Sequence, residues 1–79
     1  MPYFIKKVRM ELWDVYVCEA NSAWEVESGA NEEGQETYLG SSIGVLDGEV
    51  MVFGPFASWD EAKNQECARV DTAKLIAVG

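Results

Sequence analysis

Three patterns in this sequence contain residue types that catalysis or metal binding requires, and the first is a serine motif. The G-x-S-x-G spacing of serine hydrolases occurs at residues 40–44. In those enzymes the serine sits on a strand-to-helix turn and needs a histidine base. This sequence has no histidine, and the segment leads into a predicted hairpin instead of a helix. We therefore interpret the match as coincidental.

The second pattern is the pair of cysteines, Cys18 and Cys67. A cysteine nucleophile needs surroundings that lower the thiol pKa, and nothing in either local sequence suggests them. Two distant cysteines are also too few for a disulfide framework or a four-ligand zinc site. We expect both to be unpaired thiols that pack as small apolar side chains.

The third pattern is the abundance of carboxylates. Paired carboxylates serve as acid and base in glycosidases, but a domain of 79 residues rarely has room for the cleft that they flank. Glu32, Glu33 and Glu36 are close enough in sequence for a divalent cation, yet the D-x-[DN]-x-[DN]-G spacing of a calcium loop is absent. We therefore predict a protein that is not an enzyme and that uses no metal and no cofactor.

Length and composition predict one folded domain over residues 1–79. Hydrophobic residues make up 48% of the chain, which suffices for a compact core in a domain of this size. No run of about 18 to 20 apolar residues suits a bilayer span, and the first residues lack the pattern of a signal peptide. We expect a cytoplasmic protein with no membrane partner.

The first half of the chain has the two-residue period of β-strands. Apolar and polar residues alternate over residues 8–17, with a change of phase near Leu12 that predicts a bulge or bend. The alternation resumes at Trp24 and Val26, so we predict that residues 24–27 return beside the first strand as a hairpin. In this register the apolar partners share one face.

That hairpin predicts where several charged side chains lie. Glu25 and Glu27 would occupy its outer face about 6.6 to 6.8 Å apart, close to the spacing of successive phosphates on a nucleic-acid strand, about 6 to 7 Å. Asp14 would lie opposite Glu27, and such a like-charge pair destabilises a hairpin. The arrangement suggests that these carboxylates serve a purpose other than folding.

The clearest turn signal is the Asp-Gly dipeptide at residues 47–48, which suits a type I′ turn. It predicts a second hairpin in which Val45 faces Val50 and Ile43 faces Val52. The alternate residues are also apolar, so the sheet is predicted to be apolar on both faces. Its second face would be covered by the helix or by another subunit.

A helix is predicted near the C-terminal end. The Gly-Pro pair at residues 54–55 should end the preceding strand, and Ser58 with Glu61 forms a capping box for a helix from about Trp59 to Asp71. Residues 75–78 are predicted to form a short closing strand. The predicted fold class is α+β: a small antiparallel sheet of four to five strands in two β-hairpins, with one C-terminal helix packed on it.

The three tryptophans are predicted to lie in the core. Trp13 and Trp24 fall on the inner face of the first predicted hairpin, and Trp59 begins the helix where its ring can cover the sheet. Exposed tryptophan often anchors binding partners. If any of the three is exposed, Trp59 is the one that we expect.

The distribution of charge is the most unusual feature of the sequence. Fourteen acidic residues oppose six basic ones, a formal net charge of −8. Residues 10–62 contain twelve of the acids and no lysine or arginine. A protein that binds nucleic acid directly needs a basic surface, so this chain should instead attract basic proteins that do so. The alternative is that the charge only keeps a small protein soluble.

In its size, its acidity and the absence of basic residues over 10–62, the chain resembles the small phage-encoded anti-CRISPR proteins of the acidic DNA-mimic kind. The resemblance implies a non-enzymatic inhibitor in the host cytoplasm that occupies the nucleic-acid-binding groove of a CRISPR surveillance complex. From the charge distribution we expect the partner-binding residues to be Asp14, Glu19, Glu25, Glu27, Glu32, Glu33 and Glu36.

A second function fits the same sequence. The chain is also consistent with a generic acidic protein–protein interaction module or a sheet-mediated homodimer unrelated to nucleic acid. Monomer and homodimer both stay open. Binding by an acidic mimic should depend strongly on salt, whereas apolar dimerisation should tolerate salt.

Overall fold

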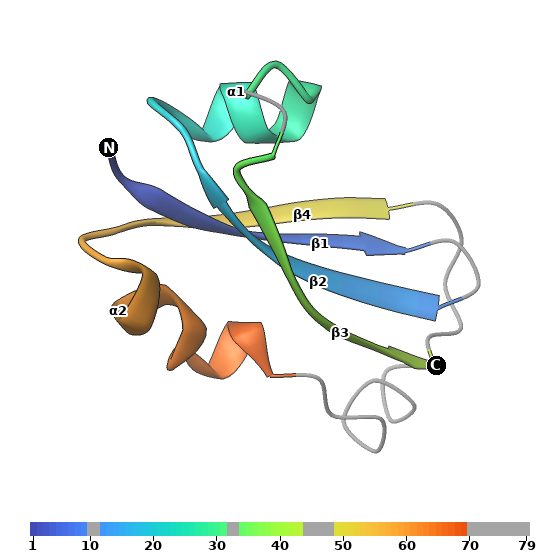
Figure 1. Cartoon of the computed structure of the whole chain (residues 1–79). Helices are drawn as coiled ribbons and strands as arrows, with labels where there is room; N and C mark the ends of the chain where they lie inside the picture. Colours follow the sequence, from blue (N-terminus) through green and yellow to red (C-terminus); the bar gives the residue numbers. More distant parts are fainter. Residues whose placement is uncertain (10–11, 32–33, 44–48, 70–79) are drawn as a thin grey trace.

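The fold is a four-stranded antiparallel sheet with short helices on both faces, seen in a computed structural model that describes residues 1–9, 12–31, 34–43 and 49–69 (Figure 1). The predicted α+β class and the predicted number of strands are confirmed. The strands lie in the order β3-β2-β1-β4. Their bounds are β1 Tyr3–Arg9, β2 Leu12–Glu19, β3 Glu36–Ile43 and β4 Glu49–Phe56. The helices are α1 Ala23–Ser28, α2 Trp59–Lys63 and the 3₁₀ helix η1 Glu66–Ala68.

The change of phase near Leu12 marks a chain reversal, so the predicted bulge within one strand is wrong. β1 and β2 pair antiparallel, with Ile5 opposite Val17 and Arg9 opposite Trp13. A reversal and a bulge both restart the alternation of apolar and polar residues in a new phase. The period alone therefore does not distinguish one bulged strand from two paired strands.

The predicted return strand over residues 24–27 is also wrong, because these residues form α1. Ser22 is the N-cap, and its Oγ accepts the backbone N–H of Glu25 at 3.4 Å. The Glu25 carboxylate in turn accepts the N–H of Asn21 at 2.8 Å. The helix ends at Gly29, whose φ of 76° is the left-handed conformation that glycine adopts easily. These local bonds satisfy both ends of a six-residue helix.

Residues two apart on a helix point to nearly opposite sides, which explains why Trp24 is exposed. Val26 faces the sheet and is fully buried, whereas Trp24 is 69% exposed. The prediction that Trp24 lies in the core is wrong, as is the expectation that Trp59 is the most exposed tryptophan. Trp13 is buried and Trp59 packs against the core, as predicted.

The second predicted hairpin is wrong because β3 and β4 lie at opposite edges of the sheet. β3 pairs with β2 and places Ile43 opposite Leu12, while β4 pairs with β1 and places Val52 opposite Lys6. The Asp-Gly dipeptide at residues 47–48 and Val45 lie outside the described residues. If β4 paired with β3, β1 would become an edge strand with fewer neighbours to cover its apolar side chains.

β4 continues through the Gly-Pro pair to Phe56, so the prediction that these residues end the strand is wrong. An edge strand tolerates proline because one of its two sides needs no donor. The glycine is required for a different reason. Gly54 has a φ of 138°, and a Cβ there would lie 2.7 Å from the Phe4 ring.

The C-terminal helix is shorter than predicted. Its capping box is confirmed: Ser58 Oγ accepts the N–H of Glu61 at 3.0 Å. However, α2 ends at Lys63, and only three residues of 3₁₀ helix follow in η1. The reason is the weak apolar stripe, since Ala62 is the one buried residue of α2. Residues 70–71 and the predicted strand at 75–78 lie outside the described part of the chain.

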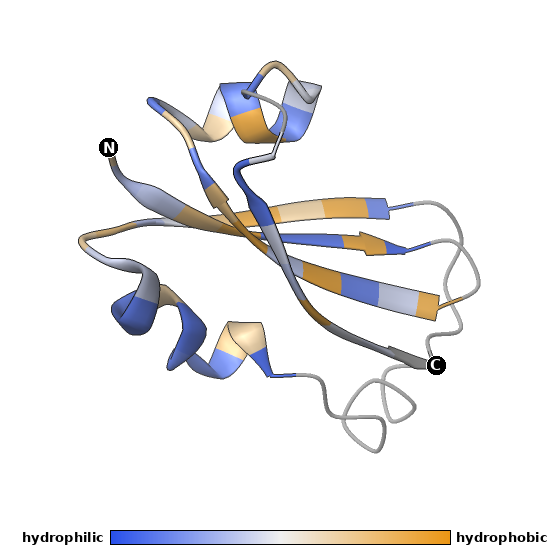
Figure 2. Ribbon diagram, in the orientation of Figure 1, coloured by the Kyte–Doolittle hydropathy of each residue, from blue (hydrophilic) through white to orange (hydrophobic). Residues whose placement is uncertain are grey.

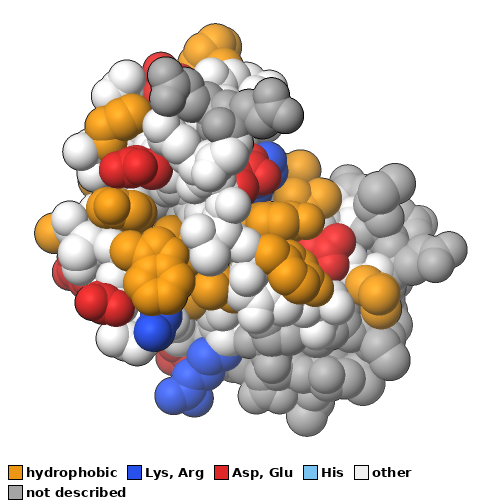
Figure 3. Space-filling model, in the orientation of Figure 1, with side chains coloured by type: hydrophobic (Ala, Val, Ile, Leu, Met, Phe, Trp, Pro, Cys, Tyr) orange, Lys and Arg blue, Asp and Glu red, His pale blue; other side chains and the backbone are white. Residues whose placement is uncertain are grey.

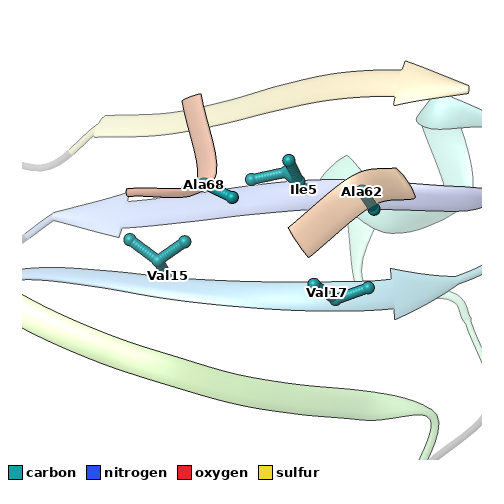
Figure 4. Close-up of a cluster of buried hydrophobic side chains, with 5 residues drawn as sticks. All are labelled: Ile5, Val15, Val17, Ala62 and Ala68. Atoms are coloured by element: carbon teal, nitrogen blue, oxygen red, sulfur yellow. The ribbon is translucent and has the colours of Figure 1, made fainter. Parts of the chain in front are cut away.

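The core consists of two clusters, one on each face of the sheet. On the face covered by α2 and η1, the buried residues are Ile5, Val15, Val17, Ala62 and Ala68 (Figure 4). On the face covered by α1, they are Phe4, Cys18, Ala20 and Val26. Figure 2 shows hydrophobic residues along the strands that separate these two clusters. None of the described helices has the length and apolar character needed to cross a bilayer.

Candidate functional site

The described part of the serine motif has no catalytic setting. The described part of the motif, Gly40 to Ile43, lies within β3, an extended strand at the edge of the sheet. A nucleophile elbow instead requires a sharp turn from a strand into a helix. Our interpretation of the motif as coincidental is therefore consistent with its position.

Both cysteines are free thiols on opposite faces of the sheet. Burial raises the pKa of Cys18 to about 12, and burial also raises the pKa of Cys67. Neither thiol is therefore activated as a nucleophile at neutral pH. Within the described ranges no three histidine, cysteine, aspartate or glutamate side chains are grouped so that they could hold a metal ion.

The structure brings two of the seven predicted partner-binding residues to one place. Asp14 on β2 and Glu36 on β3 lie on the α1 face of the sheet, on either side of Tyr16 along the strands. Burial raises the pKa of Tyr16 most, and the negative charges of both carboxylates raise it further. The negative charges of Asp14 and Glu36 thus both act on the Tyr16 side chain.

Two tyrosines and a lysine complete this group. The rings of Tyr16 and Tyr38 lie side by side across β2 and β3, with centroids 5.3 Å apart and planes tilted by 53°. Lys6 Nζ lies 3.1 Å from Glu36 Oε1, so its charge is directed to that carboxylate. Tyr38 is 53% exposed, and it was not among the residues that the sequence suggested for binding.

Glu25 and Glu27 do not form the row of charges that the sequence suggested. The strand spacing predicted for them is wrong because both lie on α1. Glu25 is half-buried and accepts a hydrogen bond in the helix cap, whereas Glu27 is exposed. The predicted pairing of Asp14 with Glu27 is also wrong, since Asp14 lies opposite Val8 on β1.

The remaining predicted residues lie apart from this group. Glu19 ends β2 on the opposite face, and its charge is the largest cause of a raised pKa at Tyr3. Glu32 and Glu33 lie outside the described residues. The structure therefore does not bring all the described acids together in a single patch.

Charge is nevertheless distributed unequally between the two sides of the sheet. On the α1 side, the described carboxylates are Asp14, Glu25, Glu27 and Glu36, and the one described lysine or arginine is Lys6. On the other side, five carboxylates are balanced by four cations, Lys7, Arg9, Lys63 and Arg69. Figure 3 shows exposed Lys and Arg side chains beside α2, at the bottom of the view.

Among the described elements, α1 is the one that packs on this face, and it lies over only one end of the sheet, so no other described helix or strand covers the rest of the face (Figure 1). We call the uncovered part the open face and define it by Val8, Leu12, Asp14, Tyr16, Tyr38 and Val50. Leu12 is 46% exposed and Val50 is 45% exposed. In Figure 3, hydrophobic and acidic side chains lie next to one another over β2 and β3. The alternation of residues in β4 had predicted that the sheet has a second apolar face. It had not predicted that β4 pairs with β1.

Comparisons with protein-family models, with curated proteins and with solved structures found no match for this chain.

Proposed function

We propose that this protein is a non-enzymatic inhibitor that uses its acidic side to occupy the nucleic-acid-binding groove of a basic protein complex. Its partner would be a protein or complex that holds DNA with lysine and arginine. The compositional resemblance described above makes a CRISPR surveillance complex the first partner to test. In that setting the inhibitor would block the binding of target DNA.

The observation that carries this proposal is the imbalance of charge between the two sides of the sheet. Lys6 is the only described lysine or arginine on the α1 side, its side chain is 16% exposed, and it pairs with Glu36. Arg9 points to the other side, where its side chain is 1% exposed and pairs with Glu49 at 3.6 Å. On the α1 side, Lys6 therefore offsets one of the four described carboxylates, which leaves an excess of three negative charges there.

Such a surface would favour binding to a basic groove for two reasons. Complementary charge accelerates encounter with the partner, and like charge repels the DNA that competes for the same groove. Both effects weaken as salt screens them, over about 10 Å at 0.1 M ionic strength. Inhibition should therefore be strong at low salt and decline steeply as salt is added.

The test is competition between the protein and labelled target DNA for purified CRISPR surveillance complexes. Increasing amounts of the protein should displace DNA in a mobility-shift assay, with an inhibition constant that rises with salt concentration. If the protein displaces DNA from none of the complexes tested, at low as well as high salt, that result would count against an inhibitor of this class.

Two variants that change net charge equally separate a local surface from a general effect of charge. Glu27→Gln on α1 and Asn64→Lys at the end of α2 both raise the formal net charge by one unit, from −8 to −7. We expect Glu27→Gln to weaken inhibition about fivefold, a loss of about 1 kcal/mol typical of one charged contact. Asn64→Lys should change inhibition less than twofold. Equal effects of the two variants would indicate that net charge alone acts.

A further inference from the structure

We propose that the open face of the sheet binds an arginine side chain of the basic partner, with the guanidinium on the Tyr16–Tyr38 pair and against the Asp14 carboxylate. This inference rests on the proposed function, because it names the contact through which the acidic side would hold its partner. The ligand is a segment of the partner protein that carries arginine.

The arrangement of side chains across the sheet supports this site. One row runs Val50, Val8, Asp14 across β4, β1 and β2, and the next row places Lys6, Tyr16 and Tyr38 across β1, β2 and β3. Adjacent rows on one face of a strand are about 6.7 Å apart. A guanidinium can therefore lie over a tyrosine ring while its N–H groups reach the carboxylate in the neighbouring row.

Arginine fits this surface better than lysine does. Its planar guanidinium stacks on aromatic rings and donates two parallel hydrogen bonds to a carboxylate, whereas the lysine ammonium is a compact and strongly hydrated charge. The aliphatic part of the arginine side chain would cover Val8 and Val50, of which Val50 is 45% exposed. The apolar and acidic parts of the open face are thus both used.

The protein's own lysine does not take the place of this ligand. Lys6 lies opposite Tyr16 on the same face, but its Nζ is within 3.1 Å of the Glu36 carboxylate. Glu36 lies one row beyond the tyrosines, on the side away from Asp14. The local cation is therefore directed towards the α1 end of the face, and Asp14 lies at the other end.

The size of the open face favours a short segment over a second copy of the chain. Four strands about 4.8 Å apart and two rows of about 6.7 Å give roughly 19 by 13 Å, or about 250 Å² before side-chain relief is counted. Stable interfaces bury about 800 Å² on each partner. Each copy would also bring a net charge of −8 to the contact.

The test is NMR titration of the isotopically labelled full chain with blocked hexa-arginine, hexa-lysine and hexa-citrulline peptides at 0.15 M salt. We expect the largest shifts at the rings of Tyr16 and Tyr38, and hexa-arginine should bind at least about threefold more tightly than hexa-lysine. Hexa-citrulline, which lacks the charge, should not bind. Shifts centred on α2, or equal affinity for the two cationic peptides, would overturn the inference.

Matched variants locate the contact. Asp14→Asn removes one charge from the open face, and Asp60→Asn makes the same change on exposed α2. The first should weaken hexa-arginine binding about fivefold and the second less than twofold. Tyr38→Leu keeps an apolar side chain but should abolish the preference for arginine over lysine. Equal losses from the two aspartate variants would contradict the proposed site.

Two further outcomes separate this inference from the function on which it rests. In the first outcome, the protein displaces DNA from its partner, and a double variant that combines Asp14→Asn with Tyr38→Leu displaces the DNA equally well. The open face is then not the contact, although the inhibitory function stands. If the peptides bind as expected but no complex is inhibited, the function fails and the arginine site stands. A dimer in sedimentation that Leu12→Lys converts to monomer would assign the face to a second copy instead.

Discussion

Reversing the charge of Glu25 and reversing that of Glu27 should affect stability very differently, although both residues lie on the six-residue helix α1. Glu25 is the third residue of the helix, and its carboxylate accepts the N–H of Asn21 at 2.8 Å. Glu27 is exposed and lies in the last turn. We expect Glu25→Lys to destabilise the fold and Glu27→Lys to leave its stability nearly unchanged.

The magnitudes follow from the two positions. Loss of a capping interaction costs about 1 kcal/mol, and replacing an acid by a base in the first turn costs about 0.5 kcal/mol more through the helix dipole. Glu25→Lys should therefore lower the free energy of unfolding by about 1.5 kcal/mol. A base in the last turn is favourable, so Glu27→Lys should change that free energy by less than about 0.5 kcal/mol.

Urea and thermal unfolding, followed by tryptophan fluorescence and circular dichroism, measure this difference. For a domain of this size, a loss of about 1.5 kcal/mol lowers Tm by roughly 6 to 12 °C. Glu25→Gln is the control, because its amide oxygen can still accept the Asn21 hydrogen bond, and it should recover most of the loss. Equal changes in the free energy of unfolding for the two lysine variants would refute the capping argument. Such a result is what we would expect if both carboxylates lay on the outer face of a strand.

Three other predictions concern the core, the second helix cap and the thiols. Val17→Ala, within the cluster under α2, should lower the free energy of unfolding by about 2 kcal/mol in the same urea experiment. Ser58→Ala should lower it by about 1 kcal/mol through loss of the α2 cap. Native Cys18 should react with iodoacetamide at pH 8 far more slowly than Cys67, and the difference should vanish in urea. Because the folded-state pKa of Cys18 is raised from 9.0 to about 12, its contribution to stability is complete below pH 9 and declines as pH rises towards 12, a decline that Cys18→Ala should reduce.

The sequence was sufficient for the class of fold, since the two-residue period indicated a sheet and the capping box at Ser58 predicted the start of α2. The period did not separate β1 from β2, and it placed a strand where α1 lies. The same S-x-x-E signal is present at Ser22 to Glu25, where it caps α1. There the alternating pattern of Trp24 and Val26 favoured a strand. A segment of four residues is too short for a period of two to be distinguished from a period of 3.6. The periodicity of this segment is therefore ambiguous, and the capping signal was the better guide to its structure.

Local sequence patterns do not determine the order of the strands in the sheet. An Asp-Gly dipeptide predicts a turn between the segments on either side of it. It does not determine whether those two segments pair with each other or with other strands of the sheet. β1 carries buried side chains on both faces, Phe4 and Ile5, and it gains a neighbour on each side when β4 joins it. That preference depends on contacts between residues far apart in sequence, such as Ile5 with Phe53, 48 positions later, and periodicity does not encode such contacts.

The candidate site depends on strand order more than on composition. The pleat of β1 sends Lys6 to the α1 face and Arg9 to the other, where each meets a carboxylate supplied by a distant strand. A sheet in which β3 paired with β4 would separate Glu36 from Lys6 and Tyr38 from Tyr16. The grouping of Asp14 with two tyrosines therefore exists only in the observed order. It follows that a variant that preserves net charge but disturbs the packing of β3 on β2 should lose the preference for arginine while it keeps a salt-dependent attraction to basic proteins.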